Sequence, residues 1–387
     1  MKESKKILLA VIITFLITLS VCAFVGYMYV SQYDYPFEKL EKVMSVIENS
    51  YVGEYSFEEC EEGAINGLIE SLGDNYAVYY NEETAKETFQ MIEGYYIGIG
   101  VEVFANMEKG YIEVISAFED SPADKAGIIN GDLIKAVDGT EYDSTQLAEA
   151  VLYMKGTNIE DPLNKVMKIT LIRGGEELTV ELKREQIDMY KVSHEVIDNI
   201  CYIRYSGFSI ESYEVFKNII KNLDSDVEGI VIDLRNNPGG EFGSSINMCN
   251  LFIDGDLIMY TVDKSGEKRE YFATNGSCEL PLAVLVNGSS ASASEIVAGS
   301  LQANGRAIIV GEKTYGKGVS QSVMYLNPYD QSEGALKLTT CKNYTPDGKW
   351  INEAITPDII VENTVIGNDI RSDAAFIEAV KSLKKDK

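Results

Sequence analysis

Four serines lie in the segment NGSSASASEI, residues 287–296, where one of them could act as a nucleophile. A serine hydroxyl must lose its proton to a base as it attacks a carbonyl carbon, and histidine is the usual base. The chain has a single histidine, His194, in the segment KVSHEVIDN. A lone histidine is more often structural than catalytic. The remaining base is a lysine in an apolar site, because desolvation disfavours the ammonium form and lowers the pKa.

Lys317 is the lysine that fits this role. It lies between Gly316 and Gly318 and follows the apolar segment AIIVG. Glycines on both sides let the backbone approach another loop closely and direct the amine inward. Most lysines beside glycines are solvated turn residues. Lys317 is therefore a candidate only in combination with the serine run.

Ser292 also has a purely structural interpretation. Ser292 and Glu295 form a Ser-x-x-Glu capping box that opens an apolar helical run with Ile296, Val297 and Leu301. Such a serine stabilises the start of a helix and needs no catalytic role. This segment alone favours capping, and the catalytic interpretation depends on residues elsewhere in the chain.

Strands and helices alternate from Gln186 onward. The pattern predicts strands at 196–205, 229–234, 282–286 and 306–310, and helices at 213–223, 244–251 and 292–303. This alternation is typical of a βαβ core with a largely parallel sheet. Sites in such sheets gather where strands end and loops begin. Two loops meet this condition: RNNPGG at 235–240 and the serine run.

Short strands, turns and one helix are predicted over residues 92–185. Gly98 and Gly100, in the segment YYIGIG, would let backbone N–H groups turn toward one anion, although they would also relieve a tight turn. Together with SPADKAGIINGDLI, this segment resembles PDZ domains, which hold the terminal carboxylate of a peptide. The resemblance implies a peptide strand beside 99–104, facing a helix that begins near Thr145. The implied binding residues are Tyr96, Ile97, Gly98, Ile99 and Gly100.

The first 30 residues form a separate element. Three lysines precede 24 uncharged residues, 7–30, which as a helix would span about 36 Å and so could cross a bilayer. A cleaved signal peptide has a shorter apolar region of about 7 to 15 residues. A single transmembrane anchor is therefore predicted, with the lysines keeping the tail 1–6 in the cytoplasm and the rest outside the cell membrane.

Apolar residues at helical spacing predict a small helical domain over residues 34–91. Leu40, Val43, Met44 and Ile47 form its first apolar stripe. Packing inside the domain explains this stripe. An amphipathic helix also leaves a homodimer contact open.

The segment NGSSASASEIVAGSLQANGRAIIVGEKTYGKGVSQ, residues 287–321, resembles the carboxy-terminal processing peptidases, which are tail-specific serine proteases with a PDZ domain. The resemblance extends over roughly residues 35–385 and includes DLRNNPGG at 233–240 and ITPD at 355–358. It implies that Ser292 is the nucleophile and that Lys317, 25 residues later, is the general base.

The same resemblance implies three further roles around this pair. Gln321 would orient the lysine, and a neutral amide suits this role because it can hold a neutral amine without restoring its charge. The N–H of Ala293, at a helix start, would stabilise the oxyanion. A second oxyanion donor would come from Gly239 or Gly240.

Composition excludes several other functions. With 34 basic and 61 acidic residues the net charge is −27, which repels phosphate backbones and disfavours nucleic-acid binding. The scattered cysteines and the lone histidine predict neither a disulfide framework nor a metal site. GEKTYGKG at 311–318 nearly matches a phosphate-binding loop, but it ends in glycine where Ser or Thr is needed, and a strand pattern follows. We therefore expect no cofactor.

These features predict an α+β multidomain protein with a tail (1–6), a transmembrane helix (7–30), a helical domain (34–91), a β-rich PDZ module (92–185) and an α/β, crotonase-like protease core (186–387). We expect a membrane-anchored, extracytoplasmic serine endopeptidase that binds protein or peptide substrates by their C-termini. The first alternative is a catalytically inactive PDZ scaffold, which would be expected to lack the serine or the lysine. The second, an acyl-CoA enzyme of the crotonase type, explains neither the PDZ module nor export.

Overall fold

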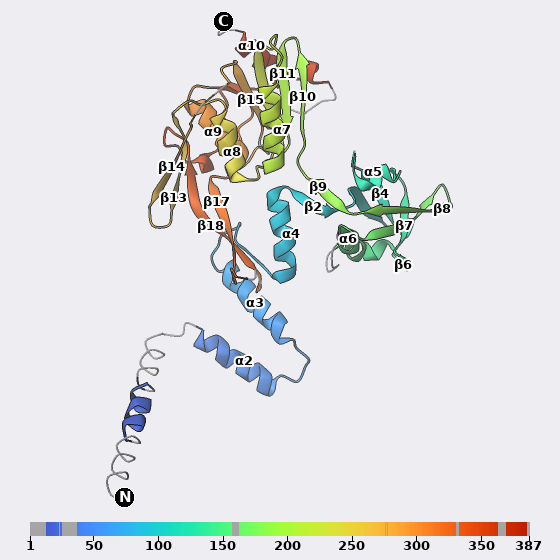
Figure 1. Ribbon diagram of the computed structural model, residues 1–387, viewed down its shortest axis with the longest axis vertical. Coiled ribbons are helices and arrows are strands. Elements are labelled where there is room, and N and C mark those ends of the chain that lie inside the picture. Colours follow the sequence, from blue (N-terminus) through green and yellow to red (C-terminus); the bar gives the residue numbers. More distant parts are fainter. Residues whose placement is uncertain are drawn as a thin grey trace, which may run out of the picture. The chain divides into compact units, whose positions relative to one another are not determined.

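The structure is a computed structural model that forms two compact units, residues 1–64 and 65–387 (Figure 1). The described residues are 13–22, 24, 37–118, 120–156, 162–274, 276, 278–329, 333–362 and 369–384.

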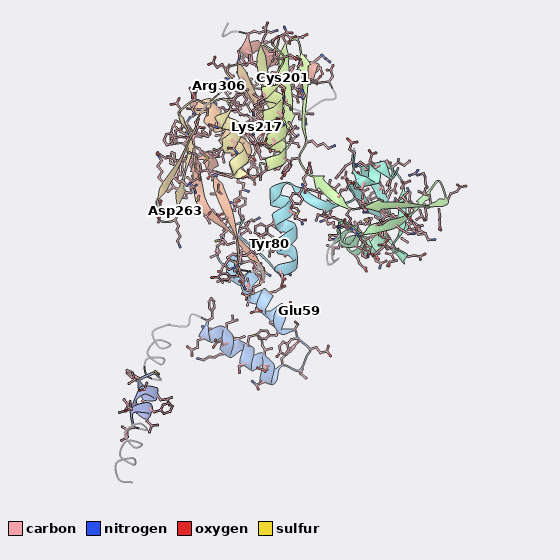
Figure 2. All side chains as sticks on the ribbon, viewed as in Figure 1. Glu59, Tyr80, Cys201, Lys217, Asp263 and Arg306 are labelled. Carbon is pink, nitrogen blue, oxygen red and sulfur yellow. The ribbon has the colours of Figure 1, made fainter. Side chains whose placement is uncertain are left out.

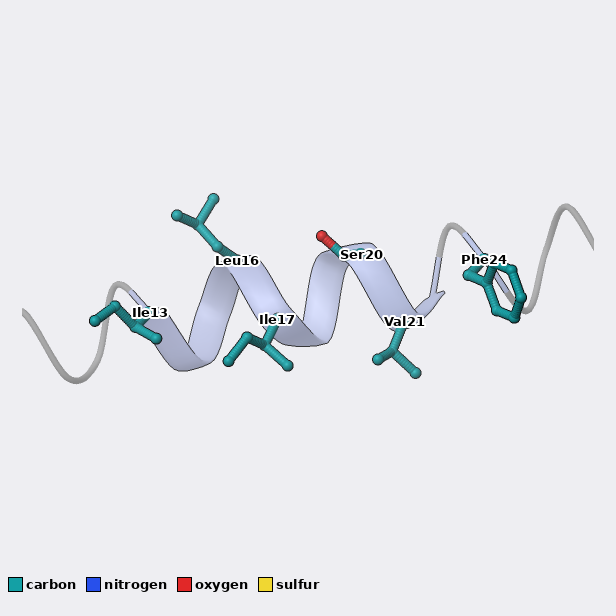
Figure 3. A pocket seen from close by; sticks show the side chains of 6 residues that line it. All are labelled: Ile13, Leu16, Ile17, Ser20, Val21 and Phe24. Atoms are coloured by element: carbon teal, nitrogen blue, oxygen red, sulfur yellow. The ribbon is translucent and has the colours of Figure 1, made fainter.

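Residues 13–22 of the first unit are helical and expose large apolar side chains, among them Phe15 and Ile17. Figure 3 shows six side chains along this segment: Ile13, Leu16, Ile17, Ser20, Val21 and Phe24. The tail 1–6 and much of the expected anchor, at 7–12, 23 and 25–30, lie outside the described residues. Within the described part of the chain, no helix has both the length and the apolar character needed to cross a membrane.

Two further helices follow, α2 (Glu38–Ser50) and α3 (Phe57–Glu70). Acidic residues in the first turn of each helix suit the positive end of the helix dipole. No residue of α2 is buried, and Leu40 and Val43 of its apolar stripe are 42% and 49% exposed. The apolar face of α2 is therefore open to solvent in this structure.

A sheet of six described strands forms the centre of residues 186–387. In order across the sheet they are β10 (Val192–Ile197), β11 (Ile200–Tyr205), β12 (Gly229–Asp233), β15 (Leu282–Val286), β16 (Ile308–Gly311) and β19 (Ile359–Ile360). β10 runs antiparallel to β11, and the other neighbouring pairs are parallel. Every residue of β12 and β15 is buried, and both strands are apolar except for Asp233, the last residue of β12, as strands covered on both faces require.

Helices cover both faces of this sheet. One face carries α7 (Ile210–Lys221), α8 (Phe242–Asn250) and α9 (Ala293–Ala303), whose apolar side chains share a core with Ile232 and Val284 (Figure 1). The other face carries α10 (Ala374–Leu383), which packs on Val231 and Leu285. Because the two central strands are covered on both sides, the loops at their carboxyl ends are held by a rigid base.

A second, antiparallel sheet lies beside this core. Its described strands are β1 (Val78–Tyr80), β13 (Leu257–Asp263), β14 (Lys268–Phe272), β17 (Val319–Tyr325) and β18 (Ala335–Tyr344). β18 is the central strand of this sheet, because it pairs with β1, β13 and β17. It thereby joins a strand from the start of the second unit to the strand that follows Lys317.

The β-rich module has its own apolar core. Its main sheet contains β3 (Val101–Asn106), β4 (Tyr111–Ala117), β5 (Leu133–Val137), β6 (Thr140–Glu141), β7 (Val166–Arg173) and β8 (Glu176–Lys183), with α5 (Pro122–Lys125) and α6 (Leu147–Lys155). A separate pair, β2 (Tyr95–Gly98) and β9 (Glu185–Asp188), leads into and out of the module. The β-rich module and the α/β core confirm the α+β multidomain prediction.

The single strand expected over 196–205 is wrong. Asp198 and Asn199 both adopt positive φ, at 49° and 66°, and turn the chain into a hairpin between β10 and β11. Two consecutive left-handed residues of this type form a type I′ turn. Cys201 (Figure 2) is the second residue of β11 and is buried, and this burial raises the pKa of its thiol to about 11.

Candidate active site

The serine run forms the loop between β15 and α9. Ser290 is fully buried, and its hydroxyl donates to the carbonyl oxygen of Leu234 (2.8 Å), which ties this loop to the end of β12. Ser294 is also buried, and its hydroxyl donates to the Asn237 carbonyl (2.9 Å). Ser289 is exposed in the turn, whereas Ser292 is partly exposed at the start of α9. Ser292 thus lies in a loop that hydrogen bonds hold in place, and its side chain is exposed enough for a ligand to reach it.

The backbone of Ser292 is strained. Its φ and ψ are 56° and −114°, outside the regions that non-glycine residues normally occupy. Such a conformation costs about 1 to 3 kcal/mol and persists only where surrounding contacts enforce it. The Ser292 N–H donates to the Glu295 carboxylate (2.9 Å), and the Glu295 N–H donates to the Ser292 carbonyl oxygen (2.9 Å). The expected capping sequence therefore helps to hold this serine.

The glycine loop 235–240 packs directly against Ser292. A Cβ atom on Gly239 would lie 2.8 Å from the carbonyl oxygen of Ala291 and 2.9 Å from the nitrogen of Ala293, and the φ of Gly239 is 102°. Only glycine permits this approach without displacing the backbone. The buried side chain of Asn237 holds the loop by donating to Tyr205 O (2.8 Å) and accepting from the Gly239 N–H (2.9 Å).

The N–H groups predicted from the sequence to stabilise an oxyanion differ in whether they already donate a hydrogen bond. Since the Gly239 N–H is bonded to Asn237, it does not face an open position. The N–H groups of Gly240 and Ala293 donate to no acceptor in the described part of the chain. Ala293 is the first residue of α9, where free N–H groups and the helix dipole both favour an anion.

Glu295 connects the loop of Ser292 to the loop of Lys317. Its side chain is fully buried, and one carboxylate oxygen accepts from Thr314 Oγ1 and the Gly316 N–H, each at 2.6 Å. The other oxygen accepts from the N–H groups of Lys317 (2.8 Å) and Ser292 (2.9 Å). One carboxylate thus satisfies donors from both loops and fixes their separation.

Lys317 is half-buried, and its amine lies 4.7 Å from the centre of the Tyr76 ring. Desolvation by burial lowers the pKa of Lys317, and the positive charge of Lys337 lowers it further, whereas the Glu295 carboxylate opposes the shift. The amine makes no hydrogen bond with any described residue, Ser292 included. A lysine in this setting is closer to the neutral form that a general base requires.

Gln321 lies on β17, four residues after Lys317, at an irregularity in the pairing with β18. Its side-chain amide donates to Thr339 Oγ1 (3.3 Å) and makes no hydrogen bond to Lys317 among the described residues. The backbone N–H of Thr339 donates in turn to Asp74 (3.3 Å). The structure therefore places Gln321 on the strand that follows the lysine, with its amide turned to β18.

Three family models match successive parts of the chain. They describe the activating protease CtpB N-terminal domain at residues 28–84, a PDZ domain at 96–183 and peptidase family S41 at 199–361. A carboxy-terminal-processing protease of Bartonella bacilliformis is 37% identical over 312 residues, which cover 78% of this chain and 69% of that protein. CtpA of Bacillus subtilis, a carboxy-terminal processing protease, is 33% identical and covers 94% of this chain and 78% of its own length.

The chain belongs to the carboxy-terminal processing proteases. It is accordingly a serine-type peptidase with a PDZ domain. A solved structure of the photosystem II D1 C-terminal processing protease has a similar fold, with a TM-score of 0.50, 24% identity, and coverage of 86% of this chain and 91% of that one.

The PDZ domain of this processing protease has a pocket at the predicted binding loop. Its volume is about 240 Å³, and Gly98, Ile99 and Gly100 line one side. The N–H groups of Ile99 and Gly100 donate to no described residue, and Gly100 adopts a φ of 74° with Ser121 packed against it. The other lining residues are Met91, Tyr96, Val101, Val103, Val151, Met154, Lys155 and Met189. Tyr96 and the two glycines thus line the pocket, whereas Ile97 is not among the lining residues.

Sequence reasoning missed several residues of the site. Glu295 was assigned to capping, and its contacts with the lysine loop depend on tertiary structure that no local pattern encodes. Tyr76 and Asp74 lie more than 200 residues before Ser292, in the segment expected to form a separate helical domain. The position of Asn237, in a predicted loop at a strand end, indicated that it could belong to the site, but nothing in the sequence predicted its hydrogen bond to Gly239.

The strain at Ser292 predicts a difference in stability between two variants of this residue. We expect Ser292→Gly to be more stable than Ser292→Ala by about 1 kcal/mol, because glycine adopts this backbone conformation without strain. The free energy of unfolding from urea titration measures this difference. At Ser289, which is exposed and outside the positive-φ set, glycine should instead be less stable than alanine. Equal stability of the two Ser292 variants would contradict the strain.

Proposed function

We propose that this processing protease cleaves peptide bonds with a Ser-Lys dyad, Ser292 and Lys317. The observation that carries the proposal is the Glu295 carboxylate, which binds the backbone N–H groups of both residues at 2.9 and 2.8 Å. A strained serine at a helix start and a lysine with a lowered pKa are thereby held at neighbouring loops. No observation favours an inactive scaffold, since the serine and the lysine are both present.

The reaction would proceed through an acyl-enzyme. Lys317 Nζ accepts the hydroxyl proton of Ser292 as Oγ bonds to the scissile carbonyl carbon. The resulting oxyanion accepts from the N–H groups of Ala293 and Gly240. The C–N bond then breaks as Lys317 returns the proton to the leaving amine, and Lys317 next takes a proton from the water that hydrolyses the ester.

Lys317 must rotate toward Ser292 for this transfer. Catalytic hydrogen bonds are often long or absent in ligand-free enzymes and form when substrate binds. Gln321 would then orient the amine, which requires its amide to leave Thr339. A single hydrogen bond of 3.3 Å between neutral groups opposes this movement, so the change is accessible.

The PDZ domain would hold the C-terminal carboxylate of the substrate at Gly98, Ile99 and Gly100. Charge-assisted hydrogen bonds from backbone N–H groups contribute about 1.5 to 3 kcal/mol. The peptide would continue as an added strand along β3, with its terminal side chain in the apolar pocket.

Residues 7–30 would anchor the protease in the cell membrane, with the catalytic domain outside. The uncharged sequence and the exposed apolar side chains of the described part, such as Phe15 and Ile17, support this role. The exposed apolar stripe of α2 supports a homodimer contact, which sedimentation equilibrium of the protein in detergent would test.

One peptide with a free or an amidated C-terminus tests both the nucleophile and the carboxylate site. We expect the full-length protein in detergent to cleave the free form roughly 10-fold faster or more, because amidation removes the charge that the PDZ loop binds. Ser292→Ala should cleave neither form. Cleavage that is indifferent to amidation would remove the carboxylate-binding role, and cleavage by Ser292→Ala would remove the nucleophile. Mass spectrometry of the products measures both rates.

A further inference from the structure

Tyr76 contacts the proposed general base from a distant part of the sequence. It lies in the turn between α3 and β1, and Asp74 fixes this turn by accepting from the Tyr76 N–H (2.9 Å). The second oxygen of Asp74 accepts from the Thr339 N–H on β18 (3.3 Å). Strand β1, which follows the turn, pairs with residues 335–337 of β18. The turn is thus attached to β18, the strand whose Thr339 hydroxyl also accepts the hydrogen bond from the Gln321 amide.

The tyrosine ring covers the amine of Lys317. The amine lies 4.7 Å from the ring centre, and both side chains are half-buried. The Tyr315 side chain, from the loop that precedes Lys317, is a close neighbour of the Tyr76 hydroxyl. A ring at this distance excludes water from one side of the amine and attracts its ammonium form through the π face.

These two effects act on the lysine in opposite directions. Exclusion of water favours the neutral amine, whereas the cation–π attraction favours the ammonium form. The pKa of Lys317 is lowered, and desolvation is the largest cause. The charged or titratable groups that face the lysine and the ring are Lys337 on β18, Glu295 on α9, Tyr315 in the preceding loop and Asp74 in the turn. Among the described residues, Glu295 is the one acidic group that raises the pKa of Lys317, and burial outweighs it.

We infer that Tyr76 is a positioning residue for the general base, with its ring holding the Lys317 amine in a dry site from which it can reach Ser292. The inference rests on the proposed Ser-Lys dyad. It assigns a role in catalysis to the turn 74–77, which carries no nucleophile, acid or base of the reaction.

The test compares Tyr76→Ala, Tyr76→Phe and Tyr76→Leu in the full-length protein across pH. Wild-type kcat/KM should rise with pH as Lys317 loses its proton. In Tyr76→Ala, water reaches the amine, so the rising limb should move to higher pH, and activity below that limb should fall about 10-fold for each unit of movement. Tyr76→Phe should keep the wild-type profile, and Tyr76→Leu should keep the limb low because leucine also excludes water.

Tyr213→Ala is the matched control, because Tyr213, on α7, is also half-buried and its ring lies under a lysine, Lys217 (5.4 Å, Figure 2), which is not among the groups that act on Lys317. This variant should leave the limb within a few tenths of a pH unit of wild type. A general loss of structure from removing a tyrosine would affect both alanine variants alike.

A second readout does not depend on cleavage. In a Ser292→Ala background, the rate at which acetic anhydride acetylates Lys317, followed by mass spectrometry across pH, reports the titration of the amine. Adding Tyr76→Ala should shift this titration upward. An unchanged titration, or a Tyr76→Ala enzyme that is more active than wild type at every pH, would overturn the inference. If Lys317→Ala remains active, it is the dyad itself that fails.

Discussion

Lys317→Arg is expected to abolish peptide cleavage as completely as Lys317→Ala. Arginine remains protonated throughout the physiological pH range, so it cannot accept the Ser292 proton, although it keeps the positive charge and is long enough to occupy the place of lysine. Loss of a general base lowers kcat by roughly 10²- to 10⁴-fold. The kcat of both variants on a peptide with a free C-terminus measures the loss.

Lys313→Arg is the control for this substitution. Lys313 is exposed in the same loop, so the change should leave kcat unaltered. Substantial activity in Lys317→Arg would exclude lysine as the base and direct attention to His194, which lies on β10 and lines a groove with residues of α7. The lowered pKa of Lys317 also fixes the sign of the pH dependence, because activity should increase as the pH rises toward and past that pKa.

Gly239→Ala should reduce kcat by about 10²- to 10³-fold, the usual effect of losing an oxyanion donor. The new methyl group would meet Ala291 O and Ala293 N at less than 3 Å, and the φ of 102° is unfavourable for alanine. The backbone must therefore shift at the position where the proposed Ala293 donor faces the substrate. KM should change little, because the PDZ pocket and the substrate strand lie elsewhere. Steady-state kinetics separate the two parameters.

Gly305→Ala provides the comparison for backbone strain alone. Gly305 also has positive φ, 63°, but a Cβ atom there would meet no atom within 4 Å. This variant should lose some stability and keep wild-type kcat. If the two alanine variants have equal kcat, the close approach of the glycine loop to Ser292 has no role in the reaction.

Much of the parallel core could be predicted from the sequence, because its elements satisfy local rules. The strand predicted at 282–286 coincides with β15, since five consecutive apolar residues fit a strand covered on both faces. The helix predicted at 292–303 begins one residue later, at Ala293, because Ser292 has positive φ and lies outside the helix. A residue that caps a helix normally has an extended backbone, whereas Ser292 has a strained backbone with positive φ.

The antiparallel sheet and the residues around Lys317 could not be predicted in the same way. β1 and β18 are separated by more than 250 residues, and their pairing depends on the folded positions of both segments. The Tyr76 contact depends on this pairing, and three of the four hydrogen bonds of Glu295 depend on the docking of the Lys317 loop. The turn at Asp198 and Asn199 was missed because the apolar pattern continued on both sides of it, although Asp and Asn both tolerate the positive φ that a type I′ turn requires.

The Glu295 carboxylate makes the two halves of the site unfold together. Its donors are three backbone N–H groups and one hydroxyl, so neither loop can move away without leaving a buried charged oxygen unsatisfied, which costs about 1 to 3 kcal/mol per lost partner. Partial opening of the lysine loop alone is therefore rare. Since three of the four donors belong to the main chain, the neighbouring side chains can vary without breaking this cooperative unit, whereas the glutamate cannot be shortened to aspartate and still reach both loops.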